Sequence, residues 1–191
     1  MFLRVQVVAA LLMLSIGGWQ SGSSTQSSNN GKEEFSAIAV NMAPGAAATP
    51  TPVDITVDRW TSDAERDRLM TVLKEKGPDE LLKVLQNEPK VGSIRTRESL
   101  AYDLRYARQL PGQDGGRRIV LGTDRPIGFL EAQAGGPTLD YRFTLIELRL
   151  GPNGKGEGKL SIAARPEFND HVLVIEDYAA EPVMLKDVQE R

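Results

Sequence analysis

Short stretches in which apolar and polar residues alternate recur along the chain and predict antiparallel β-strands. The clearest is Val53–Val57, where every second side chain is apolar, as in a strand that buries one face. A weaker alternation over residues 35–40 predicts an earlier strand. Because turn residues separate the later stretches, the end of the chain predicts an antiparallel meander. The later strands are predicted at residues 102–109, 116–123, 142–150, 158–165, 172–175 and 183–185.

The first of the later hairpins has one favoured register. Its turn, PGQDG at residues 111–115, contains two dipeptides that are typical of turns. A slip by one residue would turn Arg105 and Arg118 toward the core, which disfavours that slip. The favoured register therefore places three cross-strand pairs on one face: Tyr106 opposite Ile119, Leu104 opposite Leu121, and Tyr102 opposite Thr123.

For the second hairpin, the sequence allows two registers. Leu148 opposite Leu160 places Ile146 opposite Ile162, but a shift by two residues keeps the same face inward. The apolar positions in the first strand of this hairpin also change from odd to even numbers after Leu145. Either a β-bulge or burial of both faces of that strand would account for the change.

Two helices are predicted between the early strands and the meander. Ser62 and Glu65 have the spacing of a capping box, and an apolar stripe follows at residues 69–73. Gly77 ends the first helix and Pro78 begins the second. The predicted fold class is therefore α+β: a mainly antiparallel sheet, or a partly open sandwich, with one inserted helical hairpin.

The amino-terminal segment predicts export. Arg4 precedes an apolar run at residues 5–16, and small residues follow it, which is the pattern of a signal peptide. The run is shorter than the roughly 20 residues of a stable membrane span. Whether the segment is cleaved or remains as an anchor stays open. The predicted organisation is a signal peptide at 1–22, a flexible tether at 23–34 and one domain at 35–191.

A second low-complexity segment, rich in proline and alanine at residues 43–52, is predicted to be a loop inside that domain. Loops of this length are uncommon in compact domains. Membership of the strand at 35–42 in the core sheet therefore stays open.

Composition excludes several kinds of site. The 191 residues include one histidine and no cysteine, so disulfides, thiolate metal sites and cysteine nucleophiles are excluded. The net charge of −3 gives no electrostatic reason to expect nucleic acid as a partner. We therefore expect no cofactor and no metal.

Three candidate catalytic features are weak. The glycine-rich segment at 151–158 lacks the spacing of a phosphate-binding loop, and His171 has no nucleophile beside it in the sequence. Acidic residues near the strands could supply an acid–base pair for a glycan. Glu147 could equally pair with Arg149 or Lys159 across the strands. The acidic candidates are Asp124, Glu131, Glu147, Glu176 and Asp177.

A group of arginines around the first hairpin is the predicted binding site. Guanidinium groups suit phosphate and carboxylate, so this group could contact an anionic glycan, a lipid head group or an acidic peptide. A solvated outer face is the simpler interpretation, since Asp103 and Asp114 dilute the charge. The predicted binding residues are Arg105, Arg108, Arg117, Arg118 and Arg125.

Five sequence segments together resemble an uncharacterised family of exported bacterial proteins. They are VDITVDRWTSDAERDRL, DLRYAR, TDRPIGF, FTLIELRL and GEGKL, and the resemblance covers roughly residues 35–188. It implies a bacterial protein directed by a signal peptide, and it implies no functional residues.

Together these observations predict a periplasmic or extracellular protein that binds and has no catalytic activity. Its expected partner is an anionic component of the cell envelope or another envelope protein. The alternative is a carboxylate-dependent hydrolase that acts on an envelope glycan or peptide.

Overall fold

The computed structural model describes residues 7–8, 31–41, 50–97, 99–127, 143–169, 172–177 and 183–191. Within these ranges it contains two α-helices, α1 (Asp63–Lys76) and α2 (Pro78–Asn87), and a short 3₁₀ turn at Gln113–Gly115. The strands are β1 (Val7–Val8), β2 (Glu33–Val40), β3 (Thr51–Val57), β4 (Gly92–Thr96), β5 (Tyr102–Pro111), β6 (Arg117–Thr123), β7 (Phe143–Leu150), β8 (Lys155–Asn169), β9 (Val172–Asp177) and β10 (Val183–Glu190).

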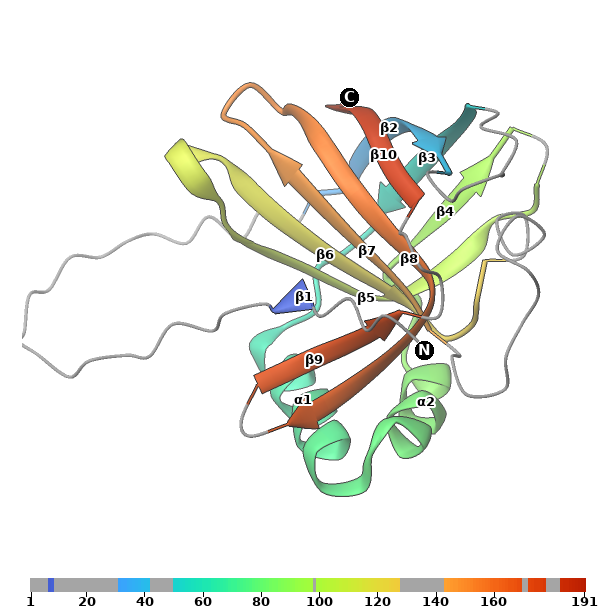
Figure 1. Ribbon diagram of the computed structural model, residues 1–191, viewed down its shortest axis with the longest axis vertical. Coiled ribbons are helices and arrows are strands. Elements are labelled where there is room, and N and C mark those ends of the chain that lie inside the picture. Colours follow the sequence, from blue (N-terminus) through green and yellow to red (C-terminus); the bar gives the residue numbers. More distant parts are fainter. Residues whose placement is uncertain are drawn as a thin grey trace, which may run out of the picture.

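The sheet closes on itself to form an antiparallel barrel (Figure 1). Within the described residues, eight strands follow one another around it in the order β2, β3, β4, β5, β6, β7, β8 and β10, and β10 pairs with β2. The predicted fold class, α+β with a mainly antiparallel sheet or a partly open sandwich and one inserted helical hairpin, is therefore wrong: the strands are antiparallel as predicted, but the sheet is a closed barrel. Alternation specifies which side chains face inward, but it does not specify whether the two edges of the sheet meet.

Strand β2 closes this barrel, which answers the question left open for residues 35–42. It begins at Glu33, within the predicted tether, and it pairs with β3 on one side and β10 on the other. The closed barrel leaves no free edge on these strands, and free edges are sites of unwanted strand pairing.

Alternate residues of the barrel strands point inward and fill the interior. The largest fully buried side chains include Phe35, Ile55, Ile119 and Leu148. An eight-stranded barrel is just wide enough for side chains to fill it or for one small ligand. In the described residues, aliphatic and aromatic side chains from all eight strands form one core cluster.

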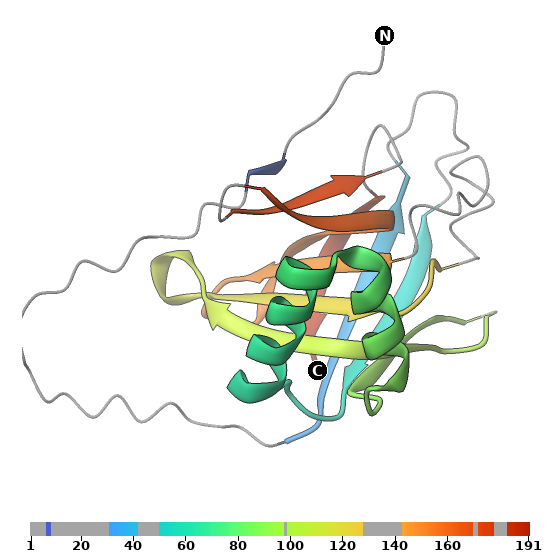
Figure 2. The same cartoon turned by 90° about the horizontal axis from the view of Figure 1, so that it is seen from below.

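The two helices pack against the outside of the barrel, where they contact β5 and β8 (Figure 2). Leu73 and Leu82 share an apolar cluster there with Phe143 and Leu145 of β7. Ile146 and Leu148, on the opposite face of β7, belong to the barrel core. Both faces of β7 are therefore buried, which accounts for its change from odd to even apolar positions, and its pairing with β8 also shifts register between Phe143 and Leu145.

The capping box predicted for α1 is confirmed. Ser62 Oγ accepts a hydrogen bond from the backbone N–H of Glu65 (3.3 Å), and Glu65 Oε2 accepts one from the backbone N–H of Ser62 (2.7 Å). The pKa of Glu65 is lowered, and the bond from the Ser62 backbone is the largest cause.

We expect Ser62→Ala to lower the free energy of unfolding by about 1 kcal/mol, because the first turn of α1 loses a partner for one backbone donor. Urea denaturation measures this loss. Ser36→Ala is the control, since Ser36 is half-buried on β2, and it should change the stability by less than about 0.5 kcal/mol. Equal stability of the two variants would contradict the prediction.

The register predicted for the first hairpin is wrong. Leu104 pairs with Thr123 and Ala107 pairs with Leu121, with a register shift between Leu104 and Tyr106. This irregularity turns Tyr106 outward, where it packs on the helix cluster. The bulge inserts a residue that the simple alternation does not reveal.

The second hairpin adopts the alternative that a two-residue shift allows. Leu148 pairs with Gly158, and Ile146 pairs with Leu160. The turn between the strands contains Gly154 at φ +71°, a backbone conformation that glycine adopts without steric cost.

Strand β8 extends beyond the barrel. Its first part pairs with β7 and β10, and residues 164–169 pair with β9. The outer edge of β9 pairs with β1 through Val7 and Val8. Within the described residues, no helix has the length and apolar character that crossing a bilayer requires.

Candidate functional site

The five predicted arginines lie in different parts of the fold, and four of them form ion pairs with residues of the protein. Arg117 points into one end of the barrel, on the same face of β6 as the buried Ile119. Arg118 is the next residue and lies on the outer face. The predicted group therefore does not form one surface.

Arg117 crosses the interior at its end of the barrel. Its guanidinium group lies 2.7 Å from Glu33 Oε2 and 2.6 Å from Glu190 Oε2. It also donates a hydrogen bond to Gln109 and lies 5.5 Å from the centre of the Phe35 ring. Since β6 neighbours neither β2 nor β10, these contacts join strands from opposite sides of the barrel. The Arg117 guanidinium group therefore links strands of the barrel to one another, and its charge is compensated within the protein.

Arg108 joins β5 to the start of α1, and Arg105 joins β5 to the residue that follows α2. Arg105 Nη1 donates a hydrogen bond to the backbone oxygen of Glu88 (2.9 Å), and its Nε lies 3.4 Å from Asp124. Arg108 Nη2 lies 2.7 Å from Asp63 Oδ1. A hydrogen bond from Arg108 holds the pKa of Asp63 below its usual value.

Arg125 is exposed, and its guanidinium carbon lies 5.1 Å from the centre of the Tyr102 ring. Its backbone oxygen accepts hydrogen bonds from the hydroxyl groups of Thr123 and Thr144. The residue follows the end of β6 that is opposite to Arg117.

Arg118 belongs to a different cluster, on the outer face of the barrel. Its Nε lies 2.8 Å from Glu147 Oε1, and Arg149 Nε donates a hydrogen bond to the same oxygen, also at 2.8 Å. The side chain of Glu147 is 18% exposed and that of Arg149 is 64% exposed. This hydrogen bond raises the pKa of Arg149 above its usual value.

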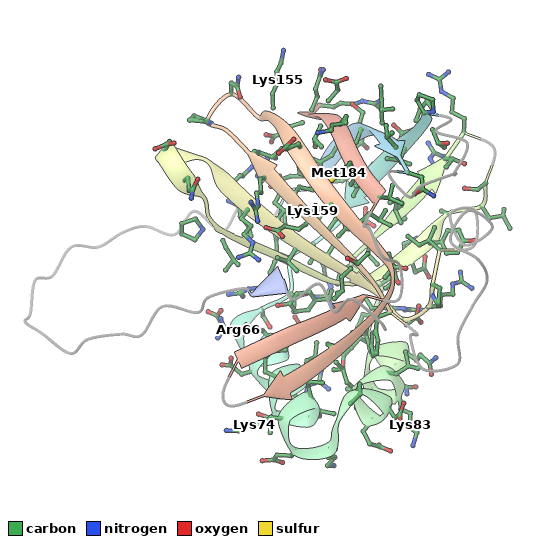
Figure 3. The ribbon with its side chains drawn as sticks, in the orientation of Figure 1. Arg66, Lys74, Lys83, Lys155, Lys159 and Met184 are labelled. Carbon is green, nitrogen blue, oxygen red and sulfur yellow. The ribbon has the colours of Figure 1, made fainter. Side chains whose placement is uncertain are left out.

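Two lysines continue this cluster across the sheet. Lys159 of β8 is exposed and stands opposite Glu147 on one side and Met184 on the other. Lys186 Nζ lies 3.1 Å from Glu157 Oε2. Figure 3 shows Lys159 and Met184 side by side on the outer face of β8 and β10.

We call Arg118, Arg149, Lys159 and Lys186 the basic strip. One member comes from each of the neighbouring strands β6, β7, β8 and β10. Glu147 and Glu157 lie among them, so the six side chains have a net charge of +2, in a chain whose net charge is −3. A shallow depression lies here, lined by Glu147, Arg149, Glu157, Gly158, Lys159 and Met184.

Within the described residues, Lys159 has no ion-pair partner, and the contacts of Arg118 and Arg149 with Glu147 use their Nε atoms. The Nη groups of both arginines are therefore free to donate hydrogen bonds to a bound anion. The strip can hold carboxylate, phosphate or sulfate groups by charge and by hydrogen bonding.

Sequence reasoning selected Arg118 but missed the other three members. The predicted pairing of Glu147 with Arg149 or Lys159 was the available signal, and its Arg149 alternative is confirmed. Lys186 could not be placed beside Glu157, because that contact depends on the pairing of β10 with β8 and on the bulge between Leu185 and Val188.

The acidic candidates with described side chains do not form a catalytic pair. Asp124 contacts Arg105, and Glu147 contacts two arginines. His171 and Glu131 lie outside the described residues, as do the side chains of Glu176 and Asp177. No cluster of ligating side chains that could hold a metal ion is found in the described part of the chain.

The comparisons with protein families, with curated proteins and with solved structures found no match to this chain.

Proposed function

We propose that the protein is an exported binding module without catalytic activity, and that its basic strip contacts an anionic component of the cell envelope. The observation that carries this proposal is the shared contact of Arg118 and Arg149 with Glu147. One carboxylate, mostly covered by its neighbours, holds two guanidinium groups side by side on an open face of the barrel.

The shared carboxylate favours binding because it positions both arginines before a ligand arrives. A long side chain loses conformational entropy when it is ordered on binding. Here folding has already ordered part of each side chain, because the Nε atoms of Arg118 and Arg149 both contact Glu147. Less conformational entropy is therefore lost when a ligand binds. The positions on strands, rather than on loops, restrain the two side chains further.

The arrangement of the acidic residues also supports binding over hydrolysis. A glycan hydrolase needs two carboxyl groups that face each other across the bond to be cleaved. Pairs of carboxylates that come together in the described residues, such as Glu33 with Glu190 and Asp103 with Asp124, share one arginine. The basic strip, in contrast, lies on the outer surface of a barrel, where an extended partner can reach it.

The test is retention of the purified protein on beads that carry dextran sulfate, at low and at high salt. We expect Arg149→Gln combined with Lys159→Gln to weaken retention at low salt roughly tenfold, because two exposed contacts are removed. Salt at 1 M should release the unsubstituted protein, since the screening length for exposed charges falls to about 3 Å at that concentration.

Lys74→Gln combined with Lys76→Gln is the matched control. Both lysines are exposed in the last turn of α1, so the control removes the same charge at a distance from the basic strip. Beads with uncharged dextran control for binding to the sugar itself. Loss of retention to the same extent in both double variants, or no retention of the unsubstituted protein, would refute the proposed function.

A further inference from the structure

We propose that the basic strip binds a linear acidic glycan with one carboxylate on each sugar, laid across strands β6, β7, β8 and β10. This inference rests on the proposed function and narrows its ligand from any anion to one class of polymer.

The spacing of the positive charges favours a polymer over a single anion. Arg118 and Arg149 are direct cross-strand neighbours, and Arg149 is in turn opposite Glu157, beside which Lys186 lies. Neighbouring strands are about 4.8 Å apart, so Arg118, Arg149 and Glu157 start at intervals of that size across the sheet, and Lys159 lies two residues further along β8. A sugar ring in a linear glycan advances the chain by a similar length, so carboxylates of different sugars can meet basic side chains on different strands.

The apolar surface beside the charges favours a glycan over a chain made only of anions. Met184 is half-buried, lines the depression together with Lys159, and has Val40 of β2 as its other cross-strand partner. Sugar rings have faces of C–H groups that can pack on such side chains, whereas inorganic polyphosphate offers nothing apolar. Burial of apolar area stabilises that contact by about 25 cal/mol per Å².

Glu157 opposes the proposed ligand and so gives the inference a distinctive test. Its side chain is 61% exposed, and it pairs with Lys186. A bound carboxylate would be repelled by Glu157 and would compete with it for Lys186. Removal of this negative charge should therefore strengthen binding of an acidic glycan.

The experiment is calorimetric titration of the purified protein with galacturonate as monomer, dimer and tetramer, and with the methyl-esterified tetramer. We expect the affinity to rise roughly two- to fivefold for each added carboxylate, which is the value of one exposed ion pair. The methyl ester, which has no charge, should not bind. Arg149→Gln combined with Lys159→Gln should reduce the affinity for the tetramer to that for the dimer.

Glu157→Gln should bind the tetramer roughly two- to fivefold more tightly, and the Lys74→Gln and Lys76→Gln control should bind it as the unsubstituted protein does. Equal affinity for monomer and tetramer, or binding of the methyl ester, would overturn the acidic-glycan inference. If dextran sulfate still retains the protein through the basic strip, the proposed function survives that result. If neither anionic probe binds, both proposals fail.

Discussion

Replacement of Arg117 by methionine is expected to lower the free energy of unfolding by about 3–5 kcal/mol, the cost of breaking a buried ion pair by removing one partner. The substitution leaves Glu33, which is 6% exposed, without the guanidinium group that compensates its charge. Glu190 is less affected, because 39% of its side chain is exposed. Urea denaturation followed by circular dichroism measures the change.

The double variant Arg117→Met with Glu33→Leu shows whether the loss of stability comes from the uncompensated charge of Glu33 or from the lost packing of Arg117. Replacement of a whole buried ion pair by apolar residues is often neutral or stabilising, so the double variant should be more stable than Arg117→Met alone. A double variant as unstable as the single one would show that Arg117 acts through its packing on Phe35.

Gly156→Ala is expected to be the second strongly destabilising change, at about 3 kcal/mol, the upper end of the usual cost of overpacking. A Cβ atom at this position would lie 1.8 Å from the backbone oxygen of Arg149. Because that atom belongs to the backbone of the paired strand β7, it cannot move aside as a side chain can. The change should therefore separate β7 from β8 locally.

Gly122→Ala is the matched control within the same barrel. Its Cβ would lie 3.5 Å from side-chain atoms of Leu145 and Tyr106, which is ordinary van der Waals contact. Thermal denaturation should show a clear fall in melting temperature for Gly156→Ala and little change for Gly122→Ala. Equal melting temperatures for the two variants would refute the steric argument.

Local features of the fold were predictable from the sequence, because local interactions determine them. The capping box at Ser62 and Glu65 and the boundary between the helices at Gly77 follow from neighbours in the chain. Closure of the barrel was not predictable, because it depends on pairing between β2 and β10, which are far apart in the sequence. The bulge near Tyr106 was likewise not predictable, since it turns Tyr106 toward helices that come from an earlier part of the sequence.

The candidate site was only partly predictable for a related reason. Arginines that are close in sequence between residues 105 and 125 were expected to form one surface. Neighbouring residues of a strand point to opposite faces, so Arg117 lies inside the barrel and Arg118 outside it. The residues that join Arg118 come from β7, β8 and β10, and only the strand order of the closed barrel brings them together.

The pairing of β2 with β10 also affects when the chain can fold. Residues 33–40 cannot complete their sheet until residues 184–190 have left the ribosome, so a growing chain has a long interval with unpaired strands. Contacts between distant parts of a sequence slow folding, and unpaired strands in that interval are prone to aggregation. A chain with this connectivity therefore reaches its closed barrel only after its last strand has been made.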